Sequence, residues 1–534
     1  MSEGILCRCR HHGWVSLLAF SSCNWKCCKT GISVNYFQSA TDKPWAMAQR
    51  ELKEAFVSNL NGTSLEEVAL GSFLSPVCVV NRGLFLILYY QAKGNLPLPH
   101  PLFSHLLLDF CALIVPLVLS CTVLSSVLHQ VAVSLTFFSA CVFCYICCGC
   151  LKNTVSAFLQ SHVEFNQVPF VTLFRVFVNV KTAISILAVD FSVFPRRYAK
   201  TETYGTGVMD FGVGAFIFAN ALVCPEARRR NISGSKMSHV AKQLLSVWPL
   251  VALGMGRLVS VKMTSYHEHV TEYGVHWNFF FTLAIVRVMA SVLLVVLPTS
   301  LLWIFALLIS GFYQFTLETS GLKAFIIHNS DREKDFLHAN KEGLFSIFGY
   351  VAIYLSGVQI GLYLMQPRAN VREWLRTLVS LLLGSFALYA ALHACQTLVE
   401  PVSRRLANFP FYLWSVAQSL FFLSCLGLVD IILLFSKRAS GCHFVPSSWN
   451  LYKKHYDGDK KSGEIGRLCL IQAVSRNQLL FFLLANVMTG LTNSVVDTIN
   501  CSTFFSLCIL LLYMFINCFV IYVLHFYGIT VKFW

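Results

Sequence analysis

The chain has 534 residues, of which 56% are hydrophobic and 13% are charged, and its formal net charge is +15. A soluble globular domain carries charge on about a quarter of its residues, so this composition excludes a soluble enzyme, a disordered chain and a fibrous repeat. We therefore expect an all-α, polytopic integral membrane protein. Its excess of lysine and arginine then belongs to cytosolic loops rather than to nucleic-acid binding.

Residues 1–46 differ from the rest of the chain. They are rich in cysteine and moderately polar, and their one apolar run, from Trp14 to Phe20, is short for a signal peptide. We expect residues 1–46 to be a disordered extension without an assigned function. Residues 47–534 are expected to form a single multi-span membrane domain.

A membrane-spanning helix needs about 20 mostly apolar residues. The chain contains about thirteen such runs, of which two are short and contain Asp190 or Asp210. The predicted spans are 68–90, 102–122, 125–150, 177–195, 208–224, 243–262, 278–298, 300–320, 343–365, 375–395, 409–436, 477–498 and 503–527.

Lysine and arginine in the loops predict the orientation of the spans. The basic stretches 228–242, 368–376 and 437–476 all fall on one side of a thirteen-span chain, which we assign to the cytosol. The N-terminus is then lumenal and the C-terminus cytosolic. Asn61, in the sequence Asn-Gly-Thr, is a predicted glycosylation site on the lumenal side.

Two predicted lumenal loops break this charge pattern. One contains Arg196, Arg197 and Lys200, and the other contains Arg404 and Arg405. Basic groups retained on the lumenal side indicate an anionic ligand there. The alternative is that these long side chains extend to lipid headgroups.

The segment 188–214 carries the densest group of ionisable residues near a span. Pro195 is expected to end or bend the preceding helix, so that the chain folds back and brings Lys200 to Asp190. A carboxylate beside a lysine at a membrane interface can act as a general base, and the lysine can stabilise an oxyanion. The alternative is a structural ion pair between helices. Asp210 is interpreted as a carboxylate at a helix N-terminus.

A second polar cluster, residues 266–278, contains three histidines and two glutamates. Their spacing does not place the histidines on one helix face, which disfavours a metal site. His276, Trp277 and Asn278 are more typical of polyol binding, with an aromatic belt at the membrane interface as the alternative. Asn486 and Asn493, seven residues apart, share one helix face and either bind a ligand or join two helices.

Several of these motifs resemble one known family. The stretch 188–214, Arg228-Arg229-Arg230, 246–250, 272–280, 340–343, Ser403-Arg404-Arg405 and 486–493 are similar to the PIG-W/Gwt family of inositol acyltransferases. The resemblance runs from about Met47 to the end, and the ending Val531-Lys532-Phe533-Trp534 fits its vertebrate branch. Residues 1–46 have no counterpart in the family pattern.

The resemblance implies a multi-pass enzyme of the endoplasmic reticulum membrane that acts in GPI-anchor biosynthesis. Such an enzyme transfers a fatty acyl chain, typically palmitoyl, from acyl-CoA to the inositol 2-hydroxyl of glucosaminyl-phosphatidylinositol. The family pattern makes Asp190 and Lys200 the catalytic pair. His276 is the reserve candidate for the base, because membrane O-acyltransferases of another family rely on histidine. No cofactor or metal is expected beyond acyl-CoA as co-substrate, and the expected partners are the two substrates and membrane lipids, without nucleic acid.

A wider set of polar side chains is expected to contact the substrates. These residues are Arg196, Arg197, Tyr204, Asp210, Arg257, His276, Trp277, Asn278, Glu342, Arg404, Arg405, Asn486 and Asn493.

The alternative function is a secondary transporter of an anionic or lipid substrate in the same membrane. Intramembrane carboxylates and glycine-interrupted spans are typical of transporters. The sequence contains no convincing internal repeat, which argues mildly against this alternative.

Overall fold

The computed structural model divides the chain into two compact units, Met1–Val57 and Ser58–Trp534, and every named helix belongs to the second. The expected extension over residues 1–46 lies outside the described residues. The structure describes residues 56, 58, 60–94, 96, 98–148, 152–164, 168–228, 236–264, 270–328, 331–442, 444–451 and 466–531.

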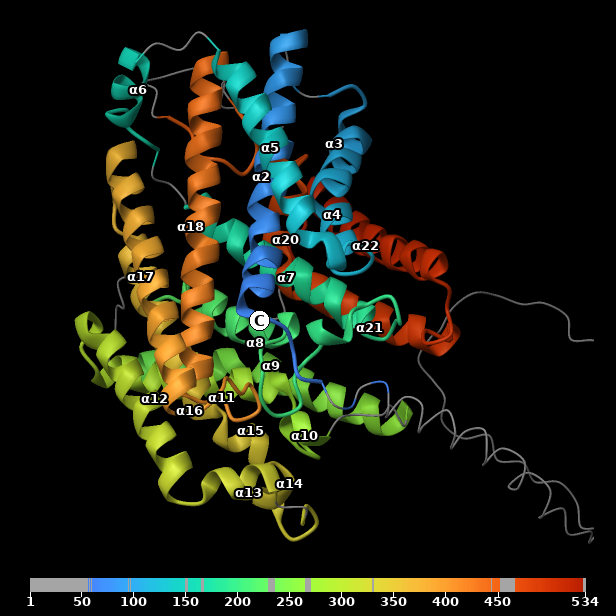
Figure 1. Ribbon diagram of the computed structural model, residues 1–534, viewed down its shortest axis with the longest axis vertical. Coiled ribbons are helices and arrows are strands. Elements are labelled where there is room, and N and C mark those ends of the chain that lie inside the picture. The colour runs from blue at the N-terminus through green and yellow to red at the C-terminus, as the bar shows by residue number, and fades with distance from the viewer. Residues whose placement is uncertain are drawn as a thin grey trace, which may run out of the picture. The chain divides into compact units, whose positions relative to one another are not determined.

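The described part is helical and contains no β-strand (Figure 1). Its first helices are α2 (Leu65–Lys93), α3 (Pro101–Asp109), the π-helix η1 (Phe110–Ile114), α4 (Val115–Ser120), the 3-10 helix η2 (Ser125–Val127), α5 (Leu128–Cys147), α6 (Lys152–Leu159), α7 (Pro169–Ala188), η3 (Arg196–Tyr198), α8 (Val208–Ala221), α9 (Lys236–Thr264) and α10 (Val270–Tyr273). They are followed by α11 (Phe279–Val296), η4 (Thr299–Leu301), α12 (Leu302–Thr319), α13 (Leu322–His328), α14 (Phe336–Ala339), α15 (Lys341–Phe345), α16 (Ile347–Leu364), α17 (Val371–Leu398), α18 (Phe409–Ser440), α20 (Leu470–Arg476), α21 (Gln478–Val495) and α22 (Thr503–Phe526).

The predicted class, an all-α polytopic membrane protein, is confirmed. Among the described residues, twelve helical segments are long and apolar enough to cross a membrane, and the 14-residue α8 is a shorter apolar helix. Each of the thirteen predicted spans overlaps one of these segments.

The fourth span begins and ends earlier than predicted. The sequence favoured 177–195, whereas α7 runs from Pro169 to Ala188. Arg175 lowers the hydropathy of the first turns, although Pro169 occupies a favourable first helical position. Asp190 therefore lies in the turn after the helix, where its backbone N–H donates to the carbonyl of Leu187 at 3.2 Å.

The longest helix, α18, fixes two opposite ends of the molecule. Asn408 caps its start by accepting a hydrogen bond from the backbone N–H of Phe411 at 3.1 Å, and Gly441 ends it in a left-handed conformation. Its 32 residues span about 48 Å at 1.5 Å per residue. A bilayer hydrocarbon core is about 30 Å thick, so the two ends of α18 belong on opposite sides of a membrane.

The loops that meet at the start of α18 form what we call the polar layer. It comprises residues 60–67, 189–207, 270–278, 331–346 and 399–408. Backbone hydrogen bonds join its segments, such as Thr63 to Thr206 at 2.6 Å and Gly205 to Val402 at 2.8 Å.

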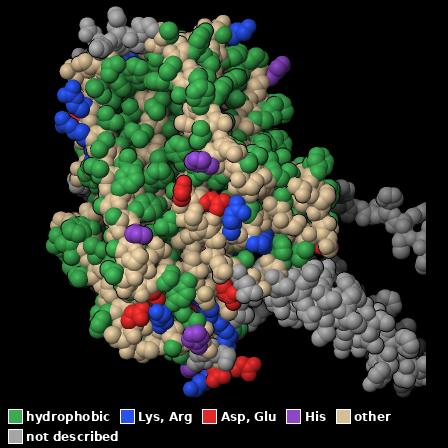
Figure 2. All heavy atoms as spheres, viewed as in Figure 1, with side chains coloured by type: hydrophobic (Ala, Val, Ile, Leu, Met, Phe, Trp, Pro, Cys, Tyr) green, Lys and Arg blue, Asp and Glu red, His purple; other side chains and the backbone are tan. Residues whose placement is uncertain are grey.

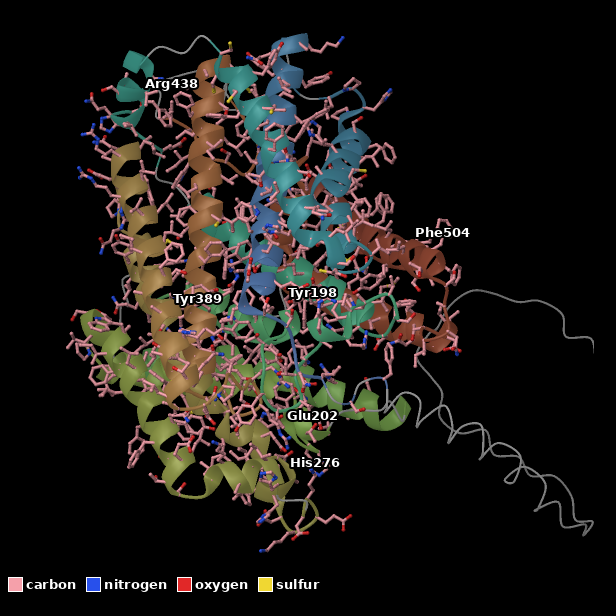
Figure 3. All side chains as sticks on the ribbon, in the orientation of Figure 1. Tyr198, Glu202, His276, Tyr389, Arg438 and Phe504 are labelled. Atoms are coloured by element: carbon pink, nitrogen blue, oxygen red, sulfur yellow. The ribbon has the colours of Figure 1, made fainter. Side chains whose placement is uncertain are left out.

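The charged side chains are unevenly distributed over the molecule. Figure 3 places Arg438, near the end of α18, in the upper part of the view, whereas Glu202 and His276 of the polar layer lie in the lower part. In Figure 2, acidic side chains lie beside basic ones in the middle and lower parts of the visible face, whereas basic side chains also lie along its upper left edge. The polar layer thus combines acidic and basic side chains at one end of a largely apolar helical bundle.

Candidate active site

Asp190 is held by a residue from the opposite end of the sequence. The side-chain amide of Asn493, on α21, donates to Oδ2 of Asp190 at 2.7 Å. Asp190 is half-buried in the turn after α7. One carboxylate oxygen thus has a fixed donor, which sets the orientation of the carboxyl group.

Arg196 stabilises the turn that carries Asp190. Its guanidinium donates to the carbonyls of Val189 at 2.8 Å, Phe191 at 3.2 Å and Phe194 at 3.1 Å. Burial lowers the pKa of Arg196 to about 10, against the opposing effect of the Asp190 carboxylate. A cation that binds the carbonyls at a helix C-terminus is favourable, so Arg196 serves the backbone here.

Lys200 pairs with Glu272 of α10 and not with Asp190, all three of which the structure describes. Its ammonium also lies 5.9 Å from the ring centre of Tyr273. The predicted direct contact between Asp190 and Lys200 is therefore wrong for this structure. Lys200 follows η3 along the chain and meets the Glu272 carboxylate of α10 there.

Glu272 is a strongly stabilised carboxylate. Burial favours its protonated form, but the positive charges of Lys200 and Arg404 outweigh burial and hold the pKa of Glu272 at about 2. Arg257 of α9 contributes to the same field. Glu272 is therefore ionised under physiological conditions and keeps Lys200 in place.

Asp210 has the role predicted for it, at the N-terminus of α8. Its carboxylate accepts from the backbone N–H groups of Thr201 and Gly207, each at 3.0 Å, and from Nε of Arg404 at 2.7 Å. Both Asp210 and Arg404 are buried. A Cβ atom on Gly207 would lie 2.3 Å from the carbonyl oxygen of Ala199, so this loop requires glycine there.

The basic residues of the two unusual loops have acidic partners within the protein. Arg197 binds the Glu67 carboxylate at 2.9 Å, and Arg405 binds the buried Glu342 at 2.9 Å. Arg332 binds the same Glu342 at 2.7 Å. The basic residues of these loops thus bind carboxylates of the protein, and the expected contact with an anionic ligand or with lipid headgroups stays a prediction.

The predicted polyol-binding set is used mostly within the protein. Trp277 donates from its ring nitrogen to Thr282 at 3.0 Å and is buried, and Asn278 caps α11. Only His276 keeps an exposed side chain, in the lower part of Figure 3. The prediction of a shared polyol site at Trp277 and Asn278 is therefore corrected. Residues 265–269, which include two of the three histidines of the cluster, lie outside the described residues.

The remaining predicted residues are divided between the site and the helices. Tyr204 donates to Glu400 at 3.3 Å within the polar layer. Asn486 donates to the carbonyl of Phe482, one turn earlier in its own helix, at 2.8 Å. The expected hydrogen bond from α21 to another segment is therefore formed by Asn493 and not by Asn486.

The sequence pattern did not predict the roles of three glutamates, Glu67, Glu272 and Glu400. Their carboxylates bind basic side chains, and Glu400 also accepts from Tyr204. Each lies far from its partner in the sequence, as Glu272 does from Lys200, 72 residues away. The one available signal was that Glu272 belongs to a string quoted for the family resemblance.

Comparison with known proteins adds an independent observation. A family model described as GWT1 matches residues 49–524. The chain is similar to a glucosaminyl-phosphatidylinositol-acyltransferase PIGW of Bos taurus, with 45% identity over 507 residues, covering 91% of this chain and 100% of the relative. The protein of the same name from Homo sapiens is 43% identical over 508 residues, with the same coverage.

A more distant relative has a different printed name. GPI-anchored wall transfer protein 1 of Eremothecium gossypii is 34% identical over 487 residues, covering 85% of this chain and 93% of the relative. The similarity thus includes the polar layer and all the helices that surround it.

Proposed function

Because this chain belongs to the GWT1 family, we propose that it transfers a fatty acyl chain to the inositol of glucosaminyl-phosphatidylinositol in GPI-anchor biosynthesis. The family predicted from the quoted motifs is confirmed by the match over residues 49–524. The similarity to the acyltransferases of Bos taurus and Homo sapiens over their full length is the observation that carries the proposal.

The donor in this proposal is acyl-CoA, with palmitoyl as the typical chain, and the acceptor is the inositol 2-hydroxyl. The protein is multi-pass, with its described helices suited to a membrane. We place it in the endoplasmic reticulum membrane, with a lumenal N-terminus and a cytosolic C-terminus. A thioester and a lipid acceptor both suit a site at the edge of an apolar bundle.

Asp190 is the proposed general base. It takes the proton of the inositol hydroxyl while the oxygen attacks the thioester carbonyl, and a C–O bond forms as the C–S bond breaks. The same proton then passes to the leaving CoA sulfur, so Asp190 returns to its ionised form. Asn493 supports this role because its amide donates to Oδ2 of Asp190 and so orients the carboxylate.

Lys200 supplies positive charge to the same loop. Its salt bridge with Glu272 holds the ammonium within the polar layer. We propose that it stabilises negative charge that develops on the thioester oxygen or on a substrate phosphate. Direct tuning of Asp190 by Lys200 is not part of this mechanism.

The experiment is acyl transfer from labelled acyl-CoA to glucosaminyl-phosphatidylinositol by membranes that contain the chain. Asp190→Asn keeps the shape of the side chain and the amide contact but removes the base, so turnover should fall about 10²–10⁴-fold. Asp497→Asn is the control, since Asp497 is an exposed acid beyond the end of α21.

Near-normal turnover of Asp190→Asn would assign the base elsewhere, with His276→Ala as the next variant. Absence of any acyl transfer by the unaltered chain, with the lipid transported instead, would favour the transporter alternative.

A further inference from the structure

Three exposed cysteines form a row at the end of α5. Cys141, Cys144 and Cys148 are free thiols, and their spacing of three and four residues places them along one face of the helix. The other exposed cysteines of the described part of the chain, Cys111 and Cys508, lie singly on other helices. A buried cysteine can serve as a small apolar residue of the core, but the exposed row has no such packing role.

The surface around this row is apolar. Phe137, one turn before Cys141, is 71% exposed, and Tyr145, beside Cys144, is 73% exposed. The segment Ser125–Cys147, which includes α5, is apolar enough to cross a membrane, yet only 17% of its apolar window is buried within the protein. In a membrane the face that carries the row therefore contacts lipid.

α5 begins beside the polar layer and ends at the opposite end of the molecule. The carbonyl of Ser125, just before α5, accepts from Arg197 of the polar layer at 3.3 Å. Near the end of α5, the ring of Phe143 lies 6.0 Å from the ring of Phe435 in α18. The next helix, α6, lies at the same end (Figure 1), since its Phe158 ring is 5.1 Å from Phe435.

This ring pair places Cys148 level with the end of α18. Phe435 lies five residues before Ser440, the last residue of α18, and Cys148 lies five residues after Phe143. Both offsets correspond to about 7.5 Å along a helix. Because α18 is about 18 Å longer than the hydrocarbon core, its last turn lies among the lipid headgroups. The orientation proposed above assigns this end to the cytosol.

We propose that Cys144 and Cys148 carry fatty acyl chains in reversible thioester linkage, with acyl-CoA in the cytosol as the donor. Cysteines at the edge of a membrane helix are the usual sites of this modification. Cys141 lies one turn deeper in the bilayer and is not assigned. The inference rests on the proposed orientation and not on the transfer reaction at Asp190.

The reaction exchanges one thioester for another. The cysteine loses its proton, and its sulfur attacks the thioester carbonyl of acyl-CoA. A new C–S bond forms as the bond to the CoA sulfur breaks, and CoA leaves as the thiol with the proton that the cysteine gave up. The attached chain then covers the apolar face of α5, beside Phe137, and holds this weakly buried helix in the cytosolic leaflet.

The test uses the full chain, expressed in cells that are supplied with an alkynyl fatty acid. The unaltered chain should become labelled, and neutral hydroxylamine, which cleaves thioesters, should remove the label. The double variant Cys144→Ser/Cys148→Ser should lose most of it. Cys508→Ser is the matched control and should keep the full label. Cys508 is also an exposed thiol on an apolar helix, but it lies near the start of α22, shortly after the segment in which Asn493 binds Asp190.

Peptide mass spectrometry of the unaltered chain locates the label without depending on the folding of any variant. Acyl chains found on Cys144 or Cys148 support the proposal. A chain without hydroxylamine-sensitive label, or with label only on Cys150 or on the cysteines of residues 1–46, would overturn it, as would full labelling of the double variant.

Acyl transfer to glucosaminyl-phosphatidylinositol, measured in the same membranes, separates this inference from the proposed function. The double variant should transfer acyl chains at the unaltered rate, because its cysteines lie at the opposite end of α5 from the polar layer. Absence of transfer by the unaltered chain would overturn the proposed function and leave the thioester label unaffected.

Discussion

Asn493 has one oxygen that the described structure leaves unused. Its side-chain nitrogen donates to Asp190, but its Oδ1 is buried and finds no hydrogen-bond partner among the described residues. A buried carbonyl oxygen without a donor costs about 1–3 kcal/mol. A hydroxyl of the inositol ring can supply that donor, so Asn493 is suited to hold the base and the acceptor together.

Replacing Asn493 by leucine should lower kcat for acyl transfer about 10–100-fold, because Asp190 loses its fixed donor. Asn486→Leu, on the same helix, should stay within about twofold, because that amide binds only the carbonyl of Phe482 in its own helix. Steady-state kinetics of the two variants in membranes would measure the difference. Equal losses in both would mean that α21 packing, and not the orientation of Asp190, was disturbed.

Glu272 makes the stability of the folded protein depend on pH over a defined range. Its pKa is about 2 in the folded protein, whereas an unperturbed glutamate has a pKa of about 4.3. The folded state therefore binds fewer protons than the unfolded state between these values. The stabilisation by Glu272 is complete above about pH 5 and is lost as the pH falls toward 2.

Glu272→Gln should remove this contribution, which is at most about 3 kcal/mol. The variant should unfold at a lower temperature than the unaltered chain at pH 7, and the difference should shrink as the pH falls from 5 to 3. Thermal unfolding in detergent at several pH values measures it. A difference that stays constant over this range would show that Lys200 does not depend on the ionised Glu272.

At the scale of elements, apolar length predicted the helices better than it predicted their ends. The span predicted at 409–436 became Phe409–Ser440, because Asn408 and Gly441 are strong capping signals at its ends. The span at 177–195 was displaced, because Arg175 interrupts the apolar run that α7 uses. Pro195 lies seven residues beyond the helix end at Ala188, so it does not end the helix, and Arg196 instead binds carbonyls of the turn that follows.

Close packing of the loop before α8 gives a prediction for that element. Gly207→Ala would place a Cβ atom 2.3 Å from the carbonyl oxygen of Ala199, which forces the backbone to move. We expect a loss of about 1–3 kcal/mol in stability, together with reduced acyl transfer as Asp210 and Lys200 shift.

Gly212→Ala is the matched control for this loop. Gly212 lies in α8, the helix that follows this loop, and a Cβ atom there would meet nothing within 4 Å. Alanine also favours the helix over glycine by about 0.5–1 kcal/mol. Thermal unfolding should therefore separate the two variants, and similar losses in both would contradict the packing argument.

At the scale of the whole molecule, the sequence predicted the membrane class but not the internal charge balance. Local spacing paired Asp190 with Lys200, which are ten residues apart. The structure pairs each with a residue from a distant helix, Asn493 and Glu272. Such contacts depend on which loops meet at one end of the bundle, and neither apolar length nor residue spacing contains that information.

The pairing also accounts for basic residues on the predicted lumenal side. Arg197, Lys200, Arg404 and Arg405 each have an acidic partner in the polar layer or the first turn of α8. Positive charge there is neutralised internally, so it need not oppose the orientation set by Arg372 and Arg376 near the start of α17.

The orientation can be tested at Asn61, which the structure attaches to the polar layer. Asn61 is exposed, and its carbonyl oxygen lies so close to Gly205 that a Cβ atom there would approach it to 2.1 Å. If the polar layer faces the lumen, Asn61 receives a glycan in microsomes of the endoplasmic reticulum, and Asn61→Gln loses the endoglycosidase-sensitive band. The second sequon, Asn231-Ile232-Ser233, should stay unmodified, so Asn231→Gln should leave the band unchanged. A glycan on Asn231 in place of Asn61 would contradict the predicted topology. The polar layer, and Asp190 with it, would then lie on the cytosolic side.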